Sequence, residues 1–388
     1  MAETDSGHPP VYSIDIDPID PLIFGDNRMV RAGYDHLILD QDPSPLLIHG
    51  VLGQWILERY PSGWPDAVLG PREADILKVD RTKKHAELLG YCYRDCKGGF
   101  WFSKPLHFRC TEVKERLLPH DLLAPQRVDV VTTASSCAFD RILDGETIEE
   151  YEQPVLVSQD VLKTVLQGIP PSKLPLQAHQ VMSIDQVFRH EFRAGVVVDN
   201  TTGTVQEGML FTRPYRRFAP APIEHQNSRM AFGIAAWLRT VGGAIGDPAA
   251  SSQGRLGGEG RRALFNFSAI HDLPFGNIRD GILAKVSGSS GFLAYLLTPA
   301  VAPSGPITIS GCQAVAAAIG KPVYASGWNS LSGQPRPLQN LIPAGSVFFF
   351  DWPHKQPDPA VVADNWLTSL SLETAHVGFG RVLIGVWK

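Results

Sequence analysis

The sequence predicts an α+β protein with mostly antiparallel sheets, folded as two domains. Three observations support this fold class: the chain length, an excess of turn-forming residues, and short apolar segments that alternate with polar residues. A chain of 388 residues exceeds one ordinary core, and it suits two domains of about 100–200 residues each. The 36 glycines and 31 prolines exceed the average share of these residues and favour many turns between strands. Hydrophobic residues make up 44% and charged residues 19% of the chain, which is a globular composition.

The first half of the chain is expected to open with a strand followed by a helix. Residues 11–16 alternate apolar and polar side chains, as a half-buried strand does, and Asp-Pro pairs then end that strand. Residues 46–60 carry apolar side chains at helical spacing. Gly98 and Gly99 lie between two aromatic segments and predict a hairpin turn. Residues 161–167 predict a short helix.

The second half of the chain contains the clearest hairpin. Residues 192–198 and 209–212 have strand-like composition, and residues 199–203 between them are typical of a turn. Further strands are predicted at residues 230–238, 263–267, 291–297, 346–352 and 382–387. Helices are predicted at residues 314–319 and 361–370.

A proline-rich segment at residues 169–175 is the best candidate for a linker, because consecutive prolines stiffen an extended backbone. The sequence therefore predicts an N-terminal domain at residues 1–175, with an insertion at residues 76–150. A C-terminal domain is predicted at residues 176–388.

Residues 254–262 carry the most distinctive local pattern, four glycines among three arginines. Glycines let a backbone approach a ligand closely, and guanidinium groups match phosphate oxygens, so this pattern favours a site for a polyanion. The alternative is a flexible connector without a ligand. No Lys-Ser or Lys-Thr follows the glycines, which excludes a P-loop, and the dinucleotide-binding fingerprint is not matched either. A second glycine turn at residues 378–381 precedes the last apolar strand.

Arg213, Arg216 and Arg217 lie beside Tyr215 and Phe218 at the end of the predicted hairpin. Arginine with aromatic side chains suits single-stranded RNA, because bases stack on rings while guanidinium groups pair with phosphates. The alternative is a solvated strand end whose amphipathic side chains anchor it to the body.

Signals for metal binding or catalysis are weaker. Cys92, Cys96, His107 and Cys110 flank the predicted hairpin turn and form a candidate zinc set. Their spacing is not that of familiar zinc sites, so ordinary buried or free thiols are the favoured interpretation. Four histidines beside charged or glycine-rich segments are candidates for acid–base catalysis, but none has a visible partner: His107, His120, His190 and His376. Motifs of serine hydrolases, zinc proteases and kinases are absent from the sequence, which predicts a protein that is not an enzyme and needs no cofactor.

The formal net charge of −5 argues against a free, non-specific nucleic-acid binder, but it allows a local basic groove. No apolar run reaches the length of about 18–20 residues that a membrane helix needs. The first ten residues lack the features of a signal peptide. Five cysteines in a chain of this length point to a reducing compartment. We therefore expect a cytoplasmic protein without membrane contact.

An ordered set of segments resembles the third subunit of the Cmr module, the RAMP protein at the guide-handle end of type III-B CRISPR complexes. The segments that carry the resemblance are residues 20–29, 43–52, 191–199, 208–211, 254–262, 326–328, 342–349, 378–380 and 383–387. Thr202 and Pro337 also match the family pattern, whereas Gly25 and Met29 depart from it, and residues 76–130 have no counterpart.

The resemblance implies two ferredoxin-like (RAMP- or RRM-like) domains with glycine-rich loops and long insertions. It implies a non-catalytic subunit that binds the 5′ handle of the guide RNA (crRNA) for antiviral defence. The expected protein partners are the large polymerase- or cyclase-like subunit and the first RAMP subunit of the backbone. With the patterns above, it assigns RNA binding to Arg28, Arg213, Arg216, Arg217, Arg255, Gly257, Gly258, Gly260, Arg261, Arg262, Gly378, Phe379, Gly380 and Arg381.

Two other functions stay open at this point. A RAMP-type endoribonuclease would process guide-RNA precursors with a histidine. A pure scaffold would contact proteins alone.

Overall fold

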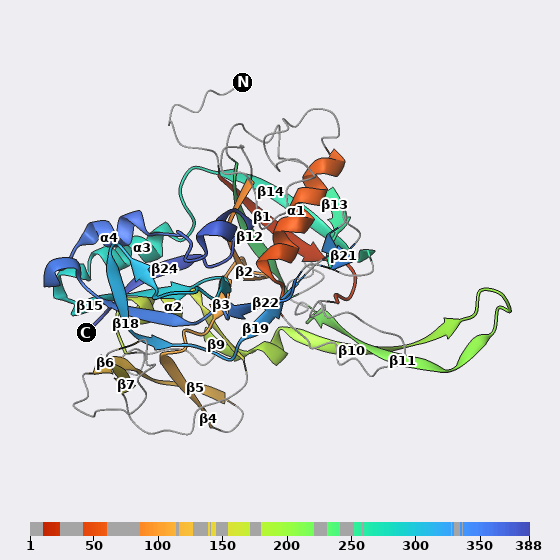
Figure 1. Ribbon diagram of the computed structural model, residues 1–388, viewed down its shortest axis with the longest axis horizontal. Helices are drawn as coiled ribbons and strands as arrows, with labels where there is room; N and C mark the ends of the chain where they lie inside the picture. Colours follow the sequence, from red (N-terminus) through yellow and green to blue (C-terminus); the bar gives the residue numbers. More distant parts are fainter. Residues whose placement is uncertain are drawn as a thin grey trace.

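A computed structural model of the 388-residue chain describes the protein. The residues it describes are 11–23, 42–59, 86–113, 116–126, 139, 141–144, 154–170, 180–220, 231–240, 252–257, 260–326, 328–329, 334–335 and 337–388. In this part of the chain strands predominate and helices are few (Figure 1). The predicted α+β class is therefore confirmed in part: the protein contains both kinds of element but is mostly β.

The larger sheet has eight strands in the order β13-β14-β1-β12-β2-β3-β8-β9, and all neighbours are antiparallel. The strands are β1 (Val11–Pro18), β2 (Ala86–Asp95), β3 (Phe100–Ser103), β8 (Val155–Ser158), β9 (Val181–Ser183), β12 (Phe232–Thr240), β13 (Ser252–Arg255) and β14 (Arg262–Ile270). Numbered along the chain as first to fourth, the central strands β14-β1-β12-β2 have the order 4-1-3-2.

Both faces of this sheet are covered, which explains the apolar content of its strands. On β1 the alternate residues Tyr12, Ile14 and Ile16 are buried in one core. That core also holds Ile48 and Leu52 of helix α1 (Pro45–Arg59), which lies over the strands in Figure 1. The alternation predicted for residues 11–16 and the helix predicted at 46–60 are thereby confirmed.

The second sheet has five strands in the order β17-β18-β23-β15-β24. They are β15 (Gly291–Leu296), β17 (Thr308–Ile309), β18 (Cys312–Ala318), β23 (Val347–Asp351) and β24 (Val382–Trp387). Its strands β24-β15-β23-β18 again have the order 4-1-3-2 along the chain. The largest core joins the two sheets, because Phe102 and Val157 of the first pack with Leu293, Phe349 and Ile384 of the second.

Three further helices pack into this shared core: α2 (Gln159–Leu166), α3 (Gly276–Leu283) and α4 (Pro359–Asp364). Smaller ladders are β4 (Phe108–Val113) with β5 (Arg116–Leu122), β6 (Ala124–Gln126) with β7 (Ile142–Asp144), β20 (Trp328–Asn329) with β21 (Gln334–Pro335), and β16 (Ala300–Val301) with β22 (Gln339–Ile342) and β19 (Val323–Ala325). Short 3₁₀ turns are Ile184–Gln186, Val286–Gly288, Pro353–Lys355 and Leu372–Val377.

Strands β10 (Phe188–Val198) and β11 (Val205–Phe218) form a separate two-stranded ribbon, which we call the arm. Figure 1 shows the arm projecting far from the body, with its tip at the turn between the strands. At the tip Asp199 accepts hydrogen bonds from the N–H groups of Thr201 and Thr202, as turn aspartates do. The hairpin predicted from residues 192–212 is confirmed.

Two predicted helices differ from the structure. Residues 314–318 belong to β18, although alanine favours helices. Ala314 and Ala316 are buried and pair directly with Phe350 and Phe349 of the neighbouring strand β23, and this pairing outweighs the local preference. The helix predicted at 361–370 ends at Asp364. Beyond it Leu367 adopts a positive φ of 59° and donates its N–H to Val382, so the chain turns toward β24.

The domain boundary predicted between residues 175 and 176 falls inside the first sheet. Strands β9, β12, β13 and β14 follow that boundary in the chain, yet they pair with β8, β1 and β2, which precede it. The division between the two sheets lies instead after Ile270, where β14 ends and before β15 begins. Local composition did not reveal this boundary, because strands from the second half of the chain complete a sheet that begins in the first half.

Candidate nucleic-acid interface

Two arginine-rich segments that are distant in sequence meet at one tyrosine. Tyr215 lies on the arm and its ring is largely buried. The Arg193 guanidinium lies 5.1 Å from the centre of this ring, and the Arg261 guanidinium lies 4.8 Å from it. Cation–π contacts of this kind hold guanidinium groups in a fixed orientation. The base of the arm and the turn between β13 and β14 therefore form one surface.

Cross-strand arginine pairs give this surface its charge. Arg189 is directly opposite Arg217 on the arm, and Arg255 is directly opposite Arg262 in the β13–β14 hairpin. All four side chains are exposed or partly exposed. Directly opposed side chains lie about 5 Å apart at Cβ, and like charges there destabilise the ladder. A bound polyanion would remove that repulsion.

One carboxylate moderates the charge of the arm. Glu191 accepts hydrogen bonds from Arg193 at 2.7 Å and from Arg217 at 3.1 Å. Hydrogen bonds from Arg193 lower the pKa of the Glu191 carboxyl, an effect that burial opposes and Arg217 reinforces. The carboxylate thus fixes two guanidinium groups on one face while leaving that face cationic. We call Arg189, Arg193, Arg217, Arg255, Arg261 and Arg262 the arginine surface.

A short extended segment ties the two hairpins together. The N–H of Ile19 donates to the carbonyl of Arg262 at 2.9 Å, and the N–H of Arg262 donates to Asp20 Oδ2 at 3.0 Å. Two residues later, Leu22 exchanges backbone hydrogen bonds of 2.7 and 2.8 Å with Arg216. The chain after β1 therefore fixes the relative position of the hairpins.

The described residues of the glycine–arginine segment lie on the two strands of a hairpin and beside its turn. Arg255 and Arg262 pair across the hairpin, and the N–H of Leu256 donates to the carbonyl of Arg261 at 2.7 Å. Leu256 is fully buried and anchors the turn in the core. Gly257 and Gly260 adopt positive φ angles of 78° and 64°, which other residues rarely reach. The glycines thus shape the turn that presents the arginines.

Other predicted residues lie elsewhere. The Arg216 side chain is mostly buried, donates to Asp42 at 3.1 Å and lies 5.0 Å from the Phe188 ring, so it anchors the base of the arm. Arg213 is opposite Arg193 in the backbone register of the arm. Arg28 and Gly258 lie outside the described residues.

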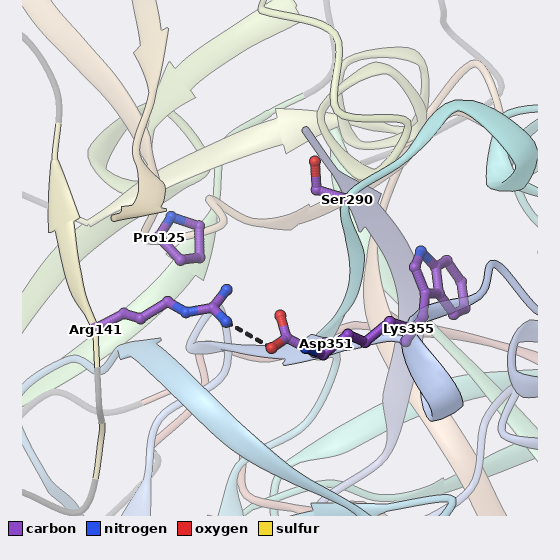
Figure 2. A pocket seen from close by; sticks show the side chains of 6 residues that line it. Pro125, Arg141, Ser290, Asp351 and Lys355 are labelled. Atoms are coloured by element: carbon purple, nitrogen blue, oxygen red, sulfur yellow. Dashed lines mark hydrogen bonds and ion pairs between the residues drawn. The ribbon is translucent and has the colours of Figure 1, made fainter. Parts of the chain in front are cut away.

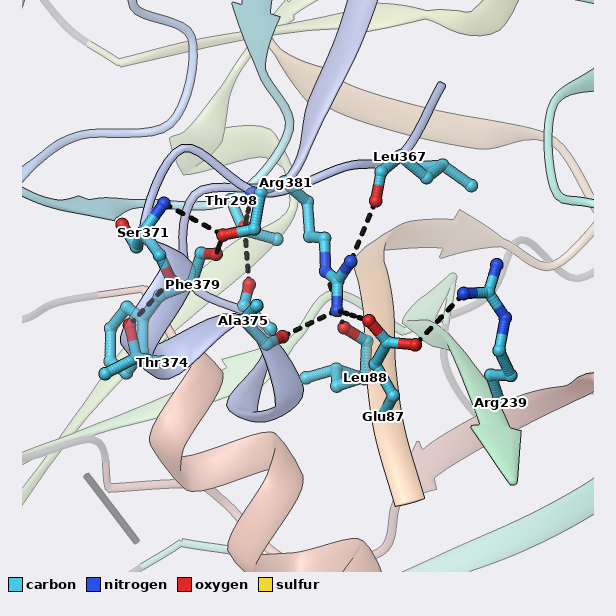
Figure 3. A network of polar contacts seen from close by, with 12 residues as sticks. Glu87, Leu88, Arg239, Thr298, Leu367, Ser371, Thr374, Ala375, Phe379 and Arg381 are labelled. Carbon is cyan, nitrogen blue, oxygen red and sulfur yellow. Dashed lines mark hydrogen bonds and ion pairs between the residues drawn. The ribbon is translucent and has the colours of Figure 1, made fainter. Parts of the chain in front are cut away.

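The closing glycine turn is a junction inside the protein, which corrects the RNA-binding role predicted for Phe379 and Arg381. Phe379 is 1% exposed and Arg381 is 2% exposed. Figure 3 shows the Arg381 guanidinium enclosed by polar partners, with donated bonds to the carbonyls of Leu88 at 2.9 Å and Leu367 at 2.8 Å and to Glu87 at 2.7 Å. Glycine patterns alone did not distinguish an internal junction from a ligand loop.

Gly378 and Gly380 belong to the same junction. Both have positive φ angles, of 94° and 67°. A Cβ at Gly378 would lie 2.8 Å from the Leu88 side chain, and a Cβ at Gly380 would lie 2.7 Å from Ser371 Oγ. These glycines therefore allow close packing between the second sheet and β2, and they are not surface residues facing a ligand.

A polar cavity of about 350 Å³ lies where β23 ends and β15 begins, and there Arg141 contacts Asp351 at 2.5 Å (Figure 2). It is lined by Pro125, Arg141, Ser290, Asp351, Trp352 and Lys355. The N–H of Arg141 also donates to the carbonyl of Val315 at 3.1 Å. These contacts hold the segment around β7 against the second sheet. The Asp351 carboxylate neutralises the positive charge of Arg141, so this guanidinium is less suited to bind an anionic ligand.

The candidate zinc residues are not gathered into a metal site. Among the described residues no group of three histidine, cysteine or acidic side chains is placed to hold a metal ion. Cys92 and Cys110 are buried in the shared core, and burial raises the pKa of the Cys92 thiol well above its usual value. Both cysteines therefore behave as small apolar side chains.

His107 is buried against the Phe349 ring, and neither ring nitrogen has a protein hydrogen-bond partner. Burial, and secondarily the nearby Lys104 charge, lowers the pKa of His107 to about 3. Its unfolded pKa is near 6.5, so the unfolded chain binds the proton first as the pH falls. A neutral, enclosed imidazole of this kind has a packing role.

We expect the His107→Leu variant to be more stable than the parent by about 1–3 kcal/mol at pH 7, because two unpaired polar atoms are removed. In the parent, the free energy of unfolding should fall from pH 6.5 toward pH 3 by up to about 1.4 kcal/mol per pH unit. The variant should lose that dependence. Urea unfolding at several pH values measures both effects. The exposed His271→Leu serves as the control, and an unchanged pH dependence in His107→Leu would contradict this account.

Arg189 and Arg193 were not predicted as site residues. The available signal was their spacing: they alternate with Glu191 along β10, opposite the cluster from Arg213 to Arg217. In a strand, alternate residues share a face.

No helix in the described part of the chain is long and apolar enough to cross a bilayer.

One comparison with known proteins identifies a family. A sequence model described as "CRISPR-associated protein (Cas_Cmr3)" matches residues 14–387. One similar solved structure is a chain of a type III-B Cmr-beta complex bound to cognate target RNA and AMPPnP, with 18% identity, a TM-score of 0.42, and coverage of 87% of this chain and 86% of that chain. Another is a chain of a Csm3-Csm4 subcomplex from a type III-A interference complex, with 11% identity, a TM-score of 0.36, and coverage of 97% and 99%. The search of curated proteins found no match.

Proposed function

Because this chain belongs to the Cas_Cmr3 family of CRISPR-associated proteins, we propose that it is a non-catalytic subunit of a type III CRISPR effector complex that binds the 5′ handle of the guide RNA. The arginine surface is the proposed RNA contact. Guanidinium groups there pair with phosphates, and the arm supplies the aromatic ring that orients two of them. In the same proposal the subunit docks the large polymerase-like subunit to the first RAMP subunit of the backbone.

The observation that carries the proposal is the opposed pairing of arginines in two adjoining hairpins. Such a surface repels itself in the free protein and gains when phosphates neutralise it. It also explains how a chain with a net charge of −5 can bind RNA, since local charge decides the contact.

The strand orders support the family's expected domains. We infer that each sheet contains a ferredoxin-like unit, because the order 4-1-3-2 occurs in both. A helix, α1, lies in the connection between β1 and β2, and α4 lies in the connection between β23 and β24. Sheets of this kind are common RNA platforms.

Ultraviolet crosslinking of the assembled complex with its guide RNA tests the proposal. Peptides that contain Arg189, Arg193, Arg217, Arg255 and Arg262 should crosslink to handle nucleotides. Peptides of the buried junction from Gly378 to Arg381 serve as the internal control and should stay free of RNA. A guide that remains bound while the arginine surface yields no crosslink would show that the handle lies elsewhere.

The non-catalytic part of the proposal has a separate test. We expect guide-repeat RNA to stay intact when it is incubated with the purified chain in EDTA, because His107 is buried away from RNA, and its lowered pKa of about 3 leaves the imidazole uncharged near neutral pH. Gel analysis of the RNA measures this. Metal-independent cleavage that disappears in His190→Ala or His376→Ala would favour the endoribonuclease alternative.

A further inference from the structure

The cavity at the end of β23 is a second polar site. It lies on the second sheet, whereas the arginine surface lies on the arm and the first sheet. Its volume of about 350 Å³ falls within the range of about 300–1,000 Å³ that pockets for small ligands occupy. None of the described residues that line it belongs to the arginine surface. The cavity therefore has the size for a ligand of its own.

Three polar groups that line the cavity have no partner in the described part of the chain. Lys355 is exposed, and no carboxylate among the described residues pairs with its ammonium group. The N–H of Ser290 donates to the carbonyl of Trp387 at 2.9 Å, but the Ser290 hydroxyl makes no hydrogen bond with a described residue. Asp351 contacts Arg141 through Oδ2, and Asp351 Oδ1 accepts no hydrogen bond from these residues. The cavity thus offers a cation, a hydroxyl group and an acceptor oxygen.

The turn that carries Lys355 has an unfavourable backbone conformation. His354 and Lys355 adopt positive φ angles of 53° and 58°, which crowd the Cβ atom of an L-residue against the backbone. The N–H of Lys355 donates to the carbonyl of Trp352 at 2.9 Å and closes the turn. The indole N–H of Trp352 donates to Ser289 Oγ at 3.1 Å and fixes the ring beside the cavity. Residues held in such conformations gather at ligand sites, so the turn supports a binding role for Lys355.

The charges of the lining match a ligand with a single negative charge. The Arg141 side chain is 10% exposed and contacts Asp351 at 2.5 Å, so its charge is already neutralised. Figure 2 shows Arg141 extending toward Asp351, with Ser290 and Pro125 near the pair. Lys355 adds one positive charge to the lining. The Asp351 side chain is 39% exposed, so its open oxygen can accept a hydrogen bond from a ligand and repels any second negative charge.

We propose that this cavity binds a carboxylate that carries an N–H group on the neighbouring carbon, as the C-terminal residue of a peptide and a free amino acid do. Lys355 pairs with the carboxylate, and the Ser290 hydroxyl donates to it. Asp351 Oδ1 accepts a hydrogen bond from the N–H group. Pro125 and Trp352 line the space left for the side chain of the ligand. Capture of a terminal carboxylate by a few fixed polar groups is a recurring mode of peptide recognition.

Phosphate ligands fit this lining less well. A phosphate monoester carries about 1.5–2 negative charges at pH 7, and only the Lys355 charge in the lining is not neutralised by Asp351. An RNA strand would bring several phosphates toward the exposed Asp351 carboxylate, which repels them. A carboxylate with its own N–H group brings one charge to Lys355 and one donor to Asp351.

A pair of matched peptides tests the proposal on the purified full chain. The probes are acetyl-glycyl-leucine with a free carboxylate and the same peptide with a C-terminal amide, and a ligand-observed NMR titration measures their affinities. We expect the amide to bind at least tenfold more weakly than the acid, because Lys355 then has no anion to pair with. Acetyl-glycyl-leucine methylated at its last amide nitrogen should also bind more weakly, because Asp351 loses its donor. Equal affinities for the acid and the amide would overturn the proposal.

Variants assign the effect to the cavity. Lys355→Met should lower the affinity for acetyl-glycyl-leucine at least tenfold and remove the preference for the acid over the amide. Lys355→Arg should keep the affinity within threefold of the parent, and so should the control Lys321→Met, which removes an exposed cation outside the lining. Unchanged binding in Lys355→Met would contradict the assignment of this residue.

Competing ligands identify the source of the carboxylate. Tighter binding of free leucine than of the acetylated dipeptide supports a free amino acid as the ligand, and the reverse order supports a peptide C-terminus. Displacement of the dipeptide by inorganic phosphate or by guide-handle RNA would overturn the proposal, as would the absence of binding by both leucine and the dipeptide at millimolar concentration. Affinity for the guide handle should be the same in Lys355→Met and the parent, so a failure of RNA binding bears on the proposed function alone.

Discussion

Replacing Arg381 with Met is expected to lower the free energy of unfolding by about 3–5 kcal/mol, the range for removing one partner of a buried ion pair. The guanidinium bonds to Glu87 and to the carbonyls of Leu88, Leu367 and Ala375. These partners come from β2 of the first sheet and from the segments around β24 of the second. Methionine fills much of the space but leaves three carbonyls and one carboxylate without this donor. Urea unfolding followed by tryptophan fluorescence measures the loss.

A matched control is Arg279→Met. Arg279 forms an ion pair of 3.5 Å with Asp280, whose side chain is 69% exposed, and exposed pairs of this kind contribute little. We expect a change below about 0.5 kcal/mol there. Equal losses of unfolding free energy in the two variants would show that the buried contacts of Arg381 contribute no more to stability than an exposed ion pair does.

The same junction predicts a dependence on pH. Burial raises the pKa of the Glu87 carboxyl, but the charge and hydrogen bonds of Arg381, helped by Arg239, outweigh it and hold the pKa below its usual value near 4.5. A carboxyl whose folded pKa is depressed contributes its full stability above the unfolded pKa. That contribution is lost as the pH falls through the folded pKa. The parent should therefore lose more stability below pH 4.5 than Glu87→Gln does.

The second large effect concerns RNA. Replacing Arg255, Arg261 and Arg262 together with Ala should lower the affinity for the guide handle on the order of 100-fold at physiological salt, because three cations that neutralise phosphates are lost. The slope of log affinity against log salt should fall by about two to three, since each phosphate contact on single-stranded RNA contributes about 0.7–1. Fluorescence anisotropy with a labelled handle at several salt concentrations measures both quantities.

The control variant removes three cations that lie away from the arginine surface. Lys285, Lys321 and Lys388 are exposed, and their joint replacement with Ala produces the same change in net charge. Its affinity should stay within threefold of the parent, with an unchanged salt slope. A similar loss in both variants would mean that overall charge governs binding, and the arginine surface would no longer be the proposed contact.

Local patterns predicted the elements whose signal is contained in a few neighbouring residues. The alternation of β1, the helical spacing of α1 and the turn chemistry of the arm are all confirmed. Residues 314–319 were misassigned because their alanines favour a helix until β23 provides a strand to pair with. The approximate position of the candidate site was also visible, as arginines beside glycines or aromatic residues.

Its assembly could not be read from the sequence, because it depends on contacts between distant segments. Arg261 and Arg193 meet at Tyr215 only after the first sheet has brought β14 beside β1. Arg381 has the same local setting as Arg261, an arginine after a glycine, yet one is buried in a junction and the other lies at the surface cluster. The packing of whole sheets decides which of the two arginines is buried, and a short sequence motif cannot predict that packing.

The position of β1 between β12 and β14 has a consequence for synthesis of the chain. Val11 pairs with Arg239 on one side and with Ile270 on the other. At translation rates of about 5–20 residues per second, the first strand therefore waits on the order of 10–50 s before its first neighbour emerges. During that time its apolar residues Tyr12, Ile14 and Ile16, all buried in the folded protein, have no sheet to join. The nascent chain is thus a natural client for chaperones until the ribosome has passed β14.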